Sequence, residues 1–597
     1  MHRSREKLSR LRDSMKKRDI AVYIIPNTDP NLGEYIPQHW RIIEWLTGFT
    51  GSAANVIVTK SFAGLWTDSR YFVQAERQLY GSGFRLMKEN VPSCPAFSGW
   101  LVSNIKKGKK IGVDGRLISI SSLRHLKEKL KRKDVTFDIE ADLISDLWEN
   151  RPEMPDSIAF DHSVDFAGKG RETKIAEVRG HMKLLDVNYH LLTSADDIMW
   201  LLNIRANDVK YSPLLISFAI LKNDQMLLFT DGEKIPVRLA AEFDRLGIVI
   251  LPYEEVNSIL SVIPSDTSIL LAPGKTSASL FCSIPETIHI IEEIDTIPAR
   301  LKTIKNGTEI KNIKNIMIKD GVALTKFFFW LEKNTGKIKI TELSSAQKLL
   351  ELRLQQTNCT GPSFSTITAF NEHGALPHYS ADSESDCEIK EEGIFLVDSG
   401  GQYLDGTTDI TRTVALGKPS VQQKADFTLA LKGTIGIAMA YFPAGTRGYQ
   451  IDVLARKALW ENRLDYGHGT GHGVGFFLNV HEGPVSIGTS SAGDNKTSLE
   501  PGMLLSDEPA IYREGHYGFR TENLVLVVED QKTEYGQFLK FETLSLCYID
   551  NALIDKSLLT PDEIIWLNKY HSMVYEKIAS FLSDNEKEWL AEKTQEI

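Results

Sequence analysis

The chain has 597 residues, which is too long for one domain and predicts three or four. Its 42% hydrophobic and 25% charged residues are typical of a globular protein, and no apolar run approaches the roughly 18 residues of a membrane-spanning helix. The formal net charge of −10 disfavours nucleic acid and membrane surfaces as partners. Five cysteines without a Cys-x-x-Cys pair favour a reducing compartment, the cytoplasm, and argue against a zinc–thiolate site.

The first predicted domain covers residues 1–155 and alternates strand and helix patterns. Its basic start, with Leu8, Leu11 and Met15 at helical spacing, predicts a surface helix rather than a targeting peptide. Residues 55–79 then follow the pattern of two strands and a helix. A proline-containing stretch at the end of this region predicts a linker. We therefore expect an α/β domain.

The second predicted domain covers residues 156–301 and resembles a weak copy of the first. Both contain a Trp-Leu pair, at Trp45 and Trp200, followed by paired apolar strands. Both then reach an aromatic-Thr-Asp turn, which ends at Asp68 in one copy and Asp231 in the other. A single repeat of this length predicts a duplicated domain rather than a solenoid, whose repeats are about 20–50 residues long.

The third predicted domain covers residues 302–597. It opens with helical patterns at 306–333 and 341–356, which a group of strands follows. A capping box at Ser420 and Gln423 then starts a second pair of helices, and more strands follow. Two helices and a strand group, repeated, predict two related halves across a curved antiparallel sheet.

Five residues of this last domain lie at the edges of strand patterns. Asp398 ends an apolar run, and Asp409 lies in a threonine-rich stretch of high β propensity. His472 stands among glycines, Glu508 follows another apolar run, and Glu522 precedes a strand. Burying a carboxylate at such positions is costly unless a partner compensates its charge.

The charges of these residues explain why they would be found together. Four carboxylates carry about −4, which two divalent cations would neutralise. Oxygen-rich ligation with one nitrogen suits Mn²⁺, Co²⁺, Fe²⁺ or Zn²⁺. Two such ions about 3.5–4 Å apart can hold a hydroxide between them and polarise a carbonyl, which is hydrolytic chemistry.

Taken singly, each of these residues has an ordinary structural explanation. An aspartate after a strand is usually a turn residue, and a histidine among glycines is more often structural than a metal ligand. Asp405-Gly406 is a hairpin turn signal, so we assign Asp405 a structural role. The ordered set of five is far more specific than any one member.

The order Asp, Asp, His, Glu, Glu resembles that of the pita-bread metallopeptidases, through "DSGGQYLDGTTDITRT", "HGTGHGVG", "VHEGP", "SDEP" and "GFRTEN". Within them the chain resembles the aminopeptidase P family, the Xaa-Pro aminopeptidases, in their long three-domain cytosolic form. The likeness covers essentially the whole chain. It implies two related N-terminal α/β domains, similar to the creatinase N-terminal domain, before a pita-bread catalytic domain.

The resemblance also implies roles for the residues. Asp398, Asp409, His472, Glu508 and Glu522 match the metal ligands, and Glu508 also matches the residue that moves a proton from the bridging water to the leaving nitrogen. His378 and His481 match catalytic and substrate-binding histidines, although periodicity alone favours packed core histidines. Arg70 matches an arginine that contacts the substrate, although the pattern alone favours a surface arginine. Arg520, two residues before Glu522, is a candidate for orienting the carboxylates.

The expected function is hydrolysis of the N-terminal Xaa-Pro bond of peptides by a dinuclear metal-bound hydroxide. The resemblance implies Mn²⁺, with Zn²⁺ or Co²⁺ as alternatives, peptide substrates with proline second, and a cytoplasmic homodimer. Prolidase uses the same ligands on dipeptides, but the long N-terminal architecture argues against it. A non-enzymatic peptide-binding module of this fold would have lost ligands, and this chain keeps all five.

Overall fold

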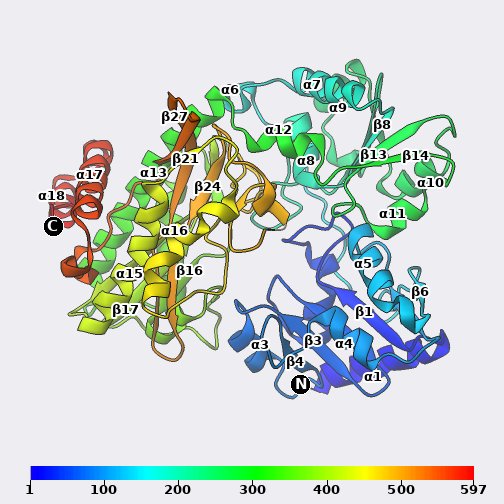
Figure 1. The fold of residues 1–597 in the computed structure, drawn as a ribbon, viewed down its shortest axis with the longest axis horizontal. Helices are drawn as coiled ribbons and strands as arrows, with labels where there is room; N and C mark the ends of the chain where they lie inside the picture. Colours follow the sequence, from blue (N-terminus) through cyan, green and yellow to red (C-terminus); the bar gives the residue numbers. More distant parts are fainter. Residues whose placement is uncertain (1, 492) are drawn as a thin grey trace. The chain divides into compact units, whose positions relative to one another are not determined.

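The computed structural model describes residues 2–491 and 493–597, and it contains two compact units (Figure 1). Unit 1 comprises Met1–His162 and Lys169–Ala299. Unit 2 comprises Ser163–Gly168 and Arg300–Ile597. Within the described residues, every helix is too short or too polar to cross a lipid bilayer.

The first sheet of unit 1 has six strands in the order β4-β3-β2-β1-β5-β6. β1 pairs antiparallel with β2 and parallel with β5, and both outer strand pairs are parallel. The strands are β1 Val22–Pro26, β2 Asn55–Thr59, β3 Ala63–Thr67, β4 Arg85–Lys88, β5 Lys110–Val113 and β6 Thr136–Asp138. The helices are α1 His2–Lys17, α2 Ile42–Thr47, α3 Phe72–Gln78, α4 Phe97–Asn104 and α5 Ile120–Leu130. Helix α1 buries Leu8, Leu11 and Met15 in the domain core, which confirms the predicted N-terminal helix.

The second sheet of unit 1 repeats this topology, with the order β12-β11-β10-β8-β13-β14. Its central strand β8 again pairs antiparallel on one side and parallel on the other, and the outer pairs are again parallel. The strands are β8 Tyr189–Leu192, β10 Phe218–Lys222, β11 Met226–Phe229, β12 Ile248–Leu251, β13 Ser268–Leu271 and β14 His289–Glu292. The helices are α7 Arg171–Leu184, α8 Ala195–Leu202, α9 Val237–Arg245, α10 Val256–Ser261 and α11 Ala278–Cys282. Identical order and direction confirm two related α/β domains.

Unit 2 contains two successive groups of two helices followed by strands, as the sequence predicts. The first group is α13 Gly307–Asn334, α14 Glu342–Leu354, β15 Cys359–Pro362, β16 Ile367–Phe370, β17 Gly393–Ser399, β18 Gly401–Tyr403, β19 Gly406–Thr407 and β20 Ile410–Leu416. The second group is α15 Val421–Ala438 and α16 Gly448–Glu461, with the short strand β21 Tyr441–Pro443 between these two helices, and then β22 Gly471–His472, β23 Ser486–Ile487, β24 Leu504–Asp507, β25 Ala510–Arg513, β26 Tyr517–Arg520, β27 Asn523–Thr533 and β28 Gly536–Thr543. Helices α17 Pro561–Ile578 and α18 Asp584–Lys593 follow.

The strands of unit 2 pair antiparallel in several short sheets, and helices α15 and α16 pack against each other (Figure 1). Side chains from both helix–strand groups share one hydrophobic core, including Phe327, Phe395, Phe427 and Leu524. Burial of these large apolar side chains holds the strand ends in fixed register, because interiors are closely packed. The predicted metal ligands lie at those strand ends.

Candidate metal centre

Strand pairing brings the two aspartates of the predicted set together. Asp398 lies near the end of β17 and pairs directly with Thr411 of β20. Asp409 immediately precedes β20 and is two residues from Thr411. One antiparallel pair of strands therefore brings together two aspartates that are separate in the sequence, as the apolar and threonine-rich patterns imply.

A second pair of strands, β24 and β27, brings the two glutamates of the predicted set together. Asp507 at the end of β24 pairs with Asn523 at the start of β27. Glu508 and Glu522 are the next residues outward, so both extend from the same end of this pair. The Glu508 amide also donates to the Thr470 carbonyl at 2.8 Å, which ties this end to the segment that carries His472.

Three of the other predicted ligands lie close to His472, and Asp398 interacts electrostatically with Asp409. Its Nε2 lies 3.5 Å from Asp409 Oδ2 and 3.8 Å from Glu508 Oε1. Ligand atoms of Asp409, His472 and Glu522 all lie within 4.8 Å of one another. The Nδ1 of His472 is 3.0 Å from the Gly473 carbonyl oxygen, which can only accept. Nδ1 therefore carries a hydrogen, and Nε2 faces the carboxylates.

The electrostatics of this centre favour cations. Burial, together with the charge of Asp409, raises the pKa of Asp398 to about 6, against the opposing effect of Arg520. Burial likewise raises the pKa values of Asp409 and Glu508 to about 7, and that of Glu522 rises well above its usual range. The Oδ1 atoms of Asp398 and Asp409 are buried without a hydrogen-bond partner. Such oxygens fit a site for divalent ions, which would supply the missing positive charge.

Arg520 orients the acidic residues, as predicted for it. Its Nη2 donates to Asp398 Oδ2 at 2.5 Å, and its Nε donates to Thr411 Oγ1 at 3.1 Å. The Thr411 hydroxyl in turn donates to Glu522 Oε2 at 2.7 Å. Arg520 Nη1 donates to the Tyr512 hydroxyl at 2.6 Å. This hydrogen-bond network orients the carboxylates of two predicted ligands, Asp398 and Glu522.

Sequence reasoning missed Thr411 and Tyr512. Thr411 lies two residues after Asp409, a spacing that places both on one face of an extended strand, so a signal was present. Tyr512 reaches the network only because β25 folds back on β26, with Tyr512 opposite Gly518. No local pattern identifies that contact.

The histidines predicted to act on the substrate lie in the same unit. The His481 ring packs edge-on against that of His472, with centroids 4.3 Å apart. The next residue, Glu482, is buried and anchored by Lys305 at 2.6 Å and Lys302 at 3.2 Å, which fixes this loop. His378 is half-buried in the turn after the short helix Asn371–Ala375. His468 lies 3.9 Å from Glu508 and 2.9 Å from the Tyr512 hydroxyl.

Arg70 lies in unit 1, in the turn between β3 and α3. Its Nε and Nη2 donate to the two carboxylate oxygens of Asp68 at 2.9 and 2.7 Å. Three-quarters of the side chain is shielded from solvent. Asp405, which we assigned a structural role, lies in the turn between β18 and β19 and pairs with Lys319 at 2.6 Å.

Comparison with known proteins places this geometry in a family. Residues 311–529 match metallopeptidase family M24, and 537–597 match the C-terminal region of peptidase M24. Residues 7–144 and 150–309 each match a creatinase/prolidase N-terminal domain. A probable Xaa-Pro aminopeptidase P of Paracoccidioides brasiliensis is 36% identical, with 99% of each chain covered. The chain belongs to the Xaa-Pro aminopeptidase P family.

Other members of the Xaa-Pro aminopeptidase P family agree over the full length. Xaa-Pro aminopeptidase 1 of Dictyostelium discoideum is 37% identical, with 98% of this chain and 95% of the relative covered. The crystal structure of an X-prolyl aminopeptidase from Caenorhabditis elegans is 34% identical, with a TM-score of 0.95 and both chains covered completely. That protein is described as a cytosolic enzyme with a di-nuclear active site. The family is one of metallopeptidases, so the chain is a hydrolase with a pita-bread catalytic domain.

Proposed function

We propose that this chain is an aminopeptidase that hydrolyses the bond between the first residue and a proline in second position. The observation that carries the proposal is the convergence of two aspartates, two glutamates and His472 at strand ends, with buried carboxylate oxygens that lack partners. Full-length similarity to Xaa-Pro aminopeptidases supports the same substrate class.

In this proposal, the five converging side chains hold two divalent ions: Asp398, Asp409, His472, Glu508 and Glu522. When bound, the ions supply Lewis acidity and activate water for attack on the peptide carbonyl. Arg520 and Thr411 hold the carboxylates in place through their hydrogen bonds. Hydrogen bonding of His472 Nδ1 to Gly473 keeps Nε2 available as a ligand.

Glu508 differs from the other acidic residues in its exposure. Its side chain is 20% exposed, against 5% for Asp409. We assign it the additional task of moving a proton to the departing proline nitrogen, which has no hydrogen of its own in the peptide bond. His378 and His481 would hold the scissile carbonyl region and stabilise its developing charge.

Three finer points belong to the same proposal. We infer Mn²⁺ as the working ion from the resemblance to the aminopeptidase P family, with Zn²⁺ or Co²⁺ as alternatives that the oxygen-rich ligand set also suits. We infer a cytoplasmic location, in line with the cytosolic C. elegans relative. We also infer a homodimer, which light scattering on the purified protein would test against a monomer mass of 67.1 kDa.

The function is tested by incubating the protein and Mn²⁺ with Arg-Pro-Pro and longer Arg-Pro-Pro peptides. Mass spectrometry should detect release of the first residue. A matched peptide with alanine in second position should be cleaved far more slowly. Hydrolysis of Xaa-Pro dipeptides with no cleavage of the longer peptides would assign the chain to prolidase activity instead.

Replacement of the two predicted substrate-binding histidines tests whether they act on the substrate or ligate the metal ions. His481→Ala and His378→Ala should each lower the catalytic rate by about 10²–10⁴-fold, the scale of lost acid–base or electrostatic assistance. Elemental analysis should find the metal content unchanged. His516→Ala, at an exposed turn, is the control and should keep full activity. Metal loss in parallel with activity would show that these histidines are ligands or structural supports.

A comparison of the two related domains supports a substrate-binding role for Arg70. Asp68 Oδ1 accepts the Arg70 amide at 3.1 Å, and Asp231 Oδ1 accepts the Glu233 amide at 2.9 Å, in equivalent turns. The aspartate alone therefore makes the turn, and the second domain makes it without an arginine. A guanidinium positioned by Asp68 can bind carbonyl or carboxylate oxygens of a peptide.

Arg70→Ala should therefore raise the Michaelis constant for tripeptides and longer substrates more than it changes stability or metal content. Steady-state kinetics across a series of peptide lengths measures this effect. Arg85→Ala, an exposed arginine on β4 of the same domain, should leave the constants unchanged. Equal Michaelis constants for Arg70→Ala and the unmodified protein at every peptide length would show that Arg70 does not bind the substrate.

A further inference from the structure

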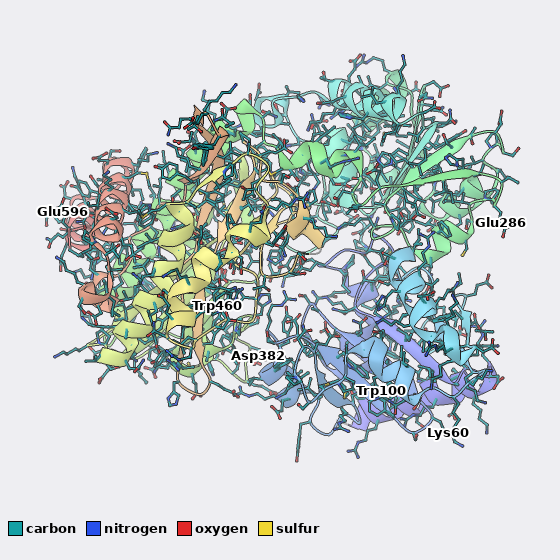
Figure 2. The ribbon with its side chains drawn as sticks, viewed as in Figure 1. Lys60, Trp100, Glu286, Asp382, Trp460 and Glu596 are labelled. Atoms are coloured by element: carbon teal, nitrogen blue, oxygen red, sulfur yellow. The ribbon has the colours of Figure 1, made fainter. Side chains whose placement is uncertain are left out.

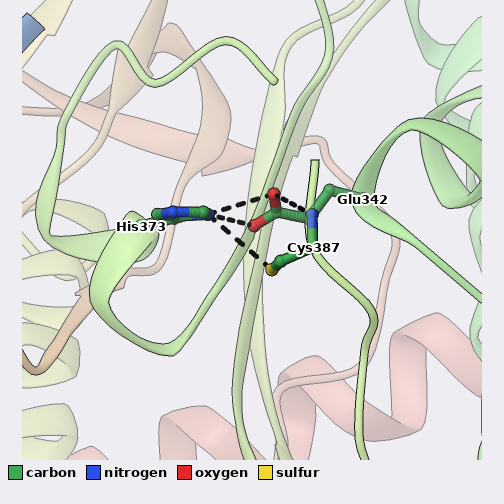
Figure 3. A group of neighbouring side chains, drawn as sticks. All are labelled: Glu342, His373 and Cys387. Carbon is green, nitrogen blue, oxygen red and sulfur yellow. Dashed lines mark hydrogen bonds and ion pairs between the residues drawn. The ribbon is translucent and has the colours of Figure 1, made fainter. Parts of the chain in front are cut away.

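A second group of side chains of the types that ligate metals lies in unit 2, outside the five residues of the candidate catalytic centre. Glu342 is the first residue of α14, His373 lies in the short helix Asn371–Ala375, and Cys387 lies in the loop before β17. One ligand atom from each lies within 4.8 Å of the other two. Figure 3 shows the His373 ring directed at both carboxylate oxygens of Glu342 and at the sulfur of Cys387.

We propose that Glu342, His373 and Cys387 bind one divalent ion of the zinc type, separate from the catalytic pair. A carboxylate, an imidazole and a thiolate are all established zinc ligands, and three protein ligands leave one position for water. The absence of a Cys-x-x-Cys pair argued against a zinc–thiolate site. That reasoning covers only ligands close in sequence, whereas this group combines three distant segments.

The distances fit such an ion with small adjustments. Tetrahedral zinc, with the usual bond lengths, separates a nitrogen from an oxygen ligand by roughly 3.4 Å and from a sulfur ligand by roughly 3.6 Å. The His373 Nδ1 to Cys387 Sγ distance is 3.8 Å. The Nδ1 to Glu342 Oε1 distance is 2.8 Å, which is a hydrogen bond. An ion that replaces this proton would move the two groups apart by about 0.6 Å.

The backbone holds two of the ligands together before any ion binds. The Glu342 amide donates to the Cys387 carbonyl at 3.1 Å, and the Cys387 amide donates to Glu342 Oε2 at 3.4 Å. The Phe370 amide and the Tyr379 hydroxyl also donate to the carboxylate, at 2.8 and 2.7 Å. Hydrogen bonds of this kind orient a carboxylate that ligates a metal, and the remaining lone pairs stay available.

The charge around the thiol also favours a cation. Glu342 is fully buried, and the acidic side chains of Asp386 and Glu372 add negative charge near Cys387. A bound divalent ion would offset this negative charge. The ion can enter from solvent, because Cys387 is only half-buried and Asp382 of the same loop, labelled in Figure 2, is exposed.

Cobalt binding to the full chain tests the proposal, because a thiolate ligand produces a sulfur-to-cobalt charge-transfer absorption in the near ultraviolet. The five catalytic positions include no cysteine, so they cannot produce this band. We expect metal-stripped protein with Co²⁺ to show it, and Cys387→Ser to lose it together with one bound ion per chain. Cys359→Ser, which replaces another half-buried cysteine of unit 2, should keep both. Asp409→Asn should keep the band, so a failure of the catalytic assignment is distinguishable.

A second measurement uses the unmodified protein and so does not depend on the folding of a variant. Zn²⁺ should slow the alkylation of Cys387 at least tenfold without slowing that of Cys359, as peptide mass spectrometry would record. Absence of the charge-transfer band in the unmodified protein would overturn the proposal. Retention of the band in Cys387→Ser, or equal alkylation of Cys387 with and without Zn²⁺, would also overturn it.

Discussion

Glu508→Gln should leave a folded protein whose turnover of Xaa-Pro peptides is lower by about 10²–10⁴-fold. The amide keeps the size of the side chain but loses the negative charge that binds a cation and the basicity that moves a proton. His472→Ala should have an effect at least as large, because it removes the nitrogen ligand 3.5 Å from Asp409. Single-turnover kinetics at saturating Mn²⁺ measures both variants, and circular dichroism verifies their fold.

Asp405→Asn is the matched control for these variants. Asp405 is also a buried acidic residue of the same domain, but it lies in the β18–β19 turn and pairs with Lys319 at 2.6 Å. Its replacement should lower stability through the lost ion pair and leave the turnover of the folded protein unchanged. A strong loss of turnover by Asp405→Asn, with normal folding and metal content, would contradict our division of the acidic residues.

Removal of divalent ions by a strong chelator should abolish turnover, and Mn²⁺ should restore it. The same treatment should lower the melting temperature, because ions that bind only the folded state stabilise it by about 2.7 kcal/mol when their concentration is a hundred times Kd. The physical reason is the cluster of buried carboxylates, whose pKa values burial raises and whose charge the ions would neutralise. Activity assays and calorimetry, with elemental analysis of the stripped protein, measure these effects.

A magnesium control sharpens the chelation experiment. Mg²⁺ binds oxygen ligands and keeps several waters, so it should restore much less activity than Mn²⁺ at a site that includes His472. Full turnover after complete removal of the ions would be incompatible with a catalytic role for them. An unchanged melting temperature would show that the buried carboxylates are neutralised by protons rather than by cations.

Residue types and their order identified the catalytic domain and its five candidate ligands. Each of Asp398, Asp409, Glu508 and Glu522 stands at the edge of an apolar strand pattern, where hydrophobic burial fixes the strand and leaves the charge at its end. The duplication of the α/β domain could also be predicted from the sequence, because paired apolar strands and a Thr-Asp turn recur in both copies. These features depend on periodicity and local chemistry, which a single sequence contains.

Contacts between distant segments were decided only by the tertiary structure. Tyr512 meets Arg520 because a hairpin folds back, and Thr411 meets Glu522 because two separate strand groups share one core. Cys387 lies in an acidic stretch of the sequence and packs beside Glu342 and His373. Sequence spacing cannot reveal such neighbours, because long-range packing determines which loop lies against which helix end. The sequence therefore predicted five candidate metal ligands in the catalytic domain, and only the fold brought Glu342, His373 and Cys387 together.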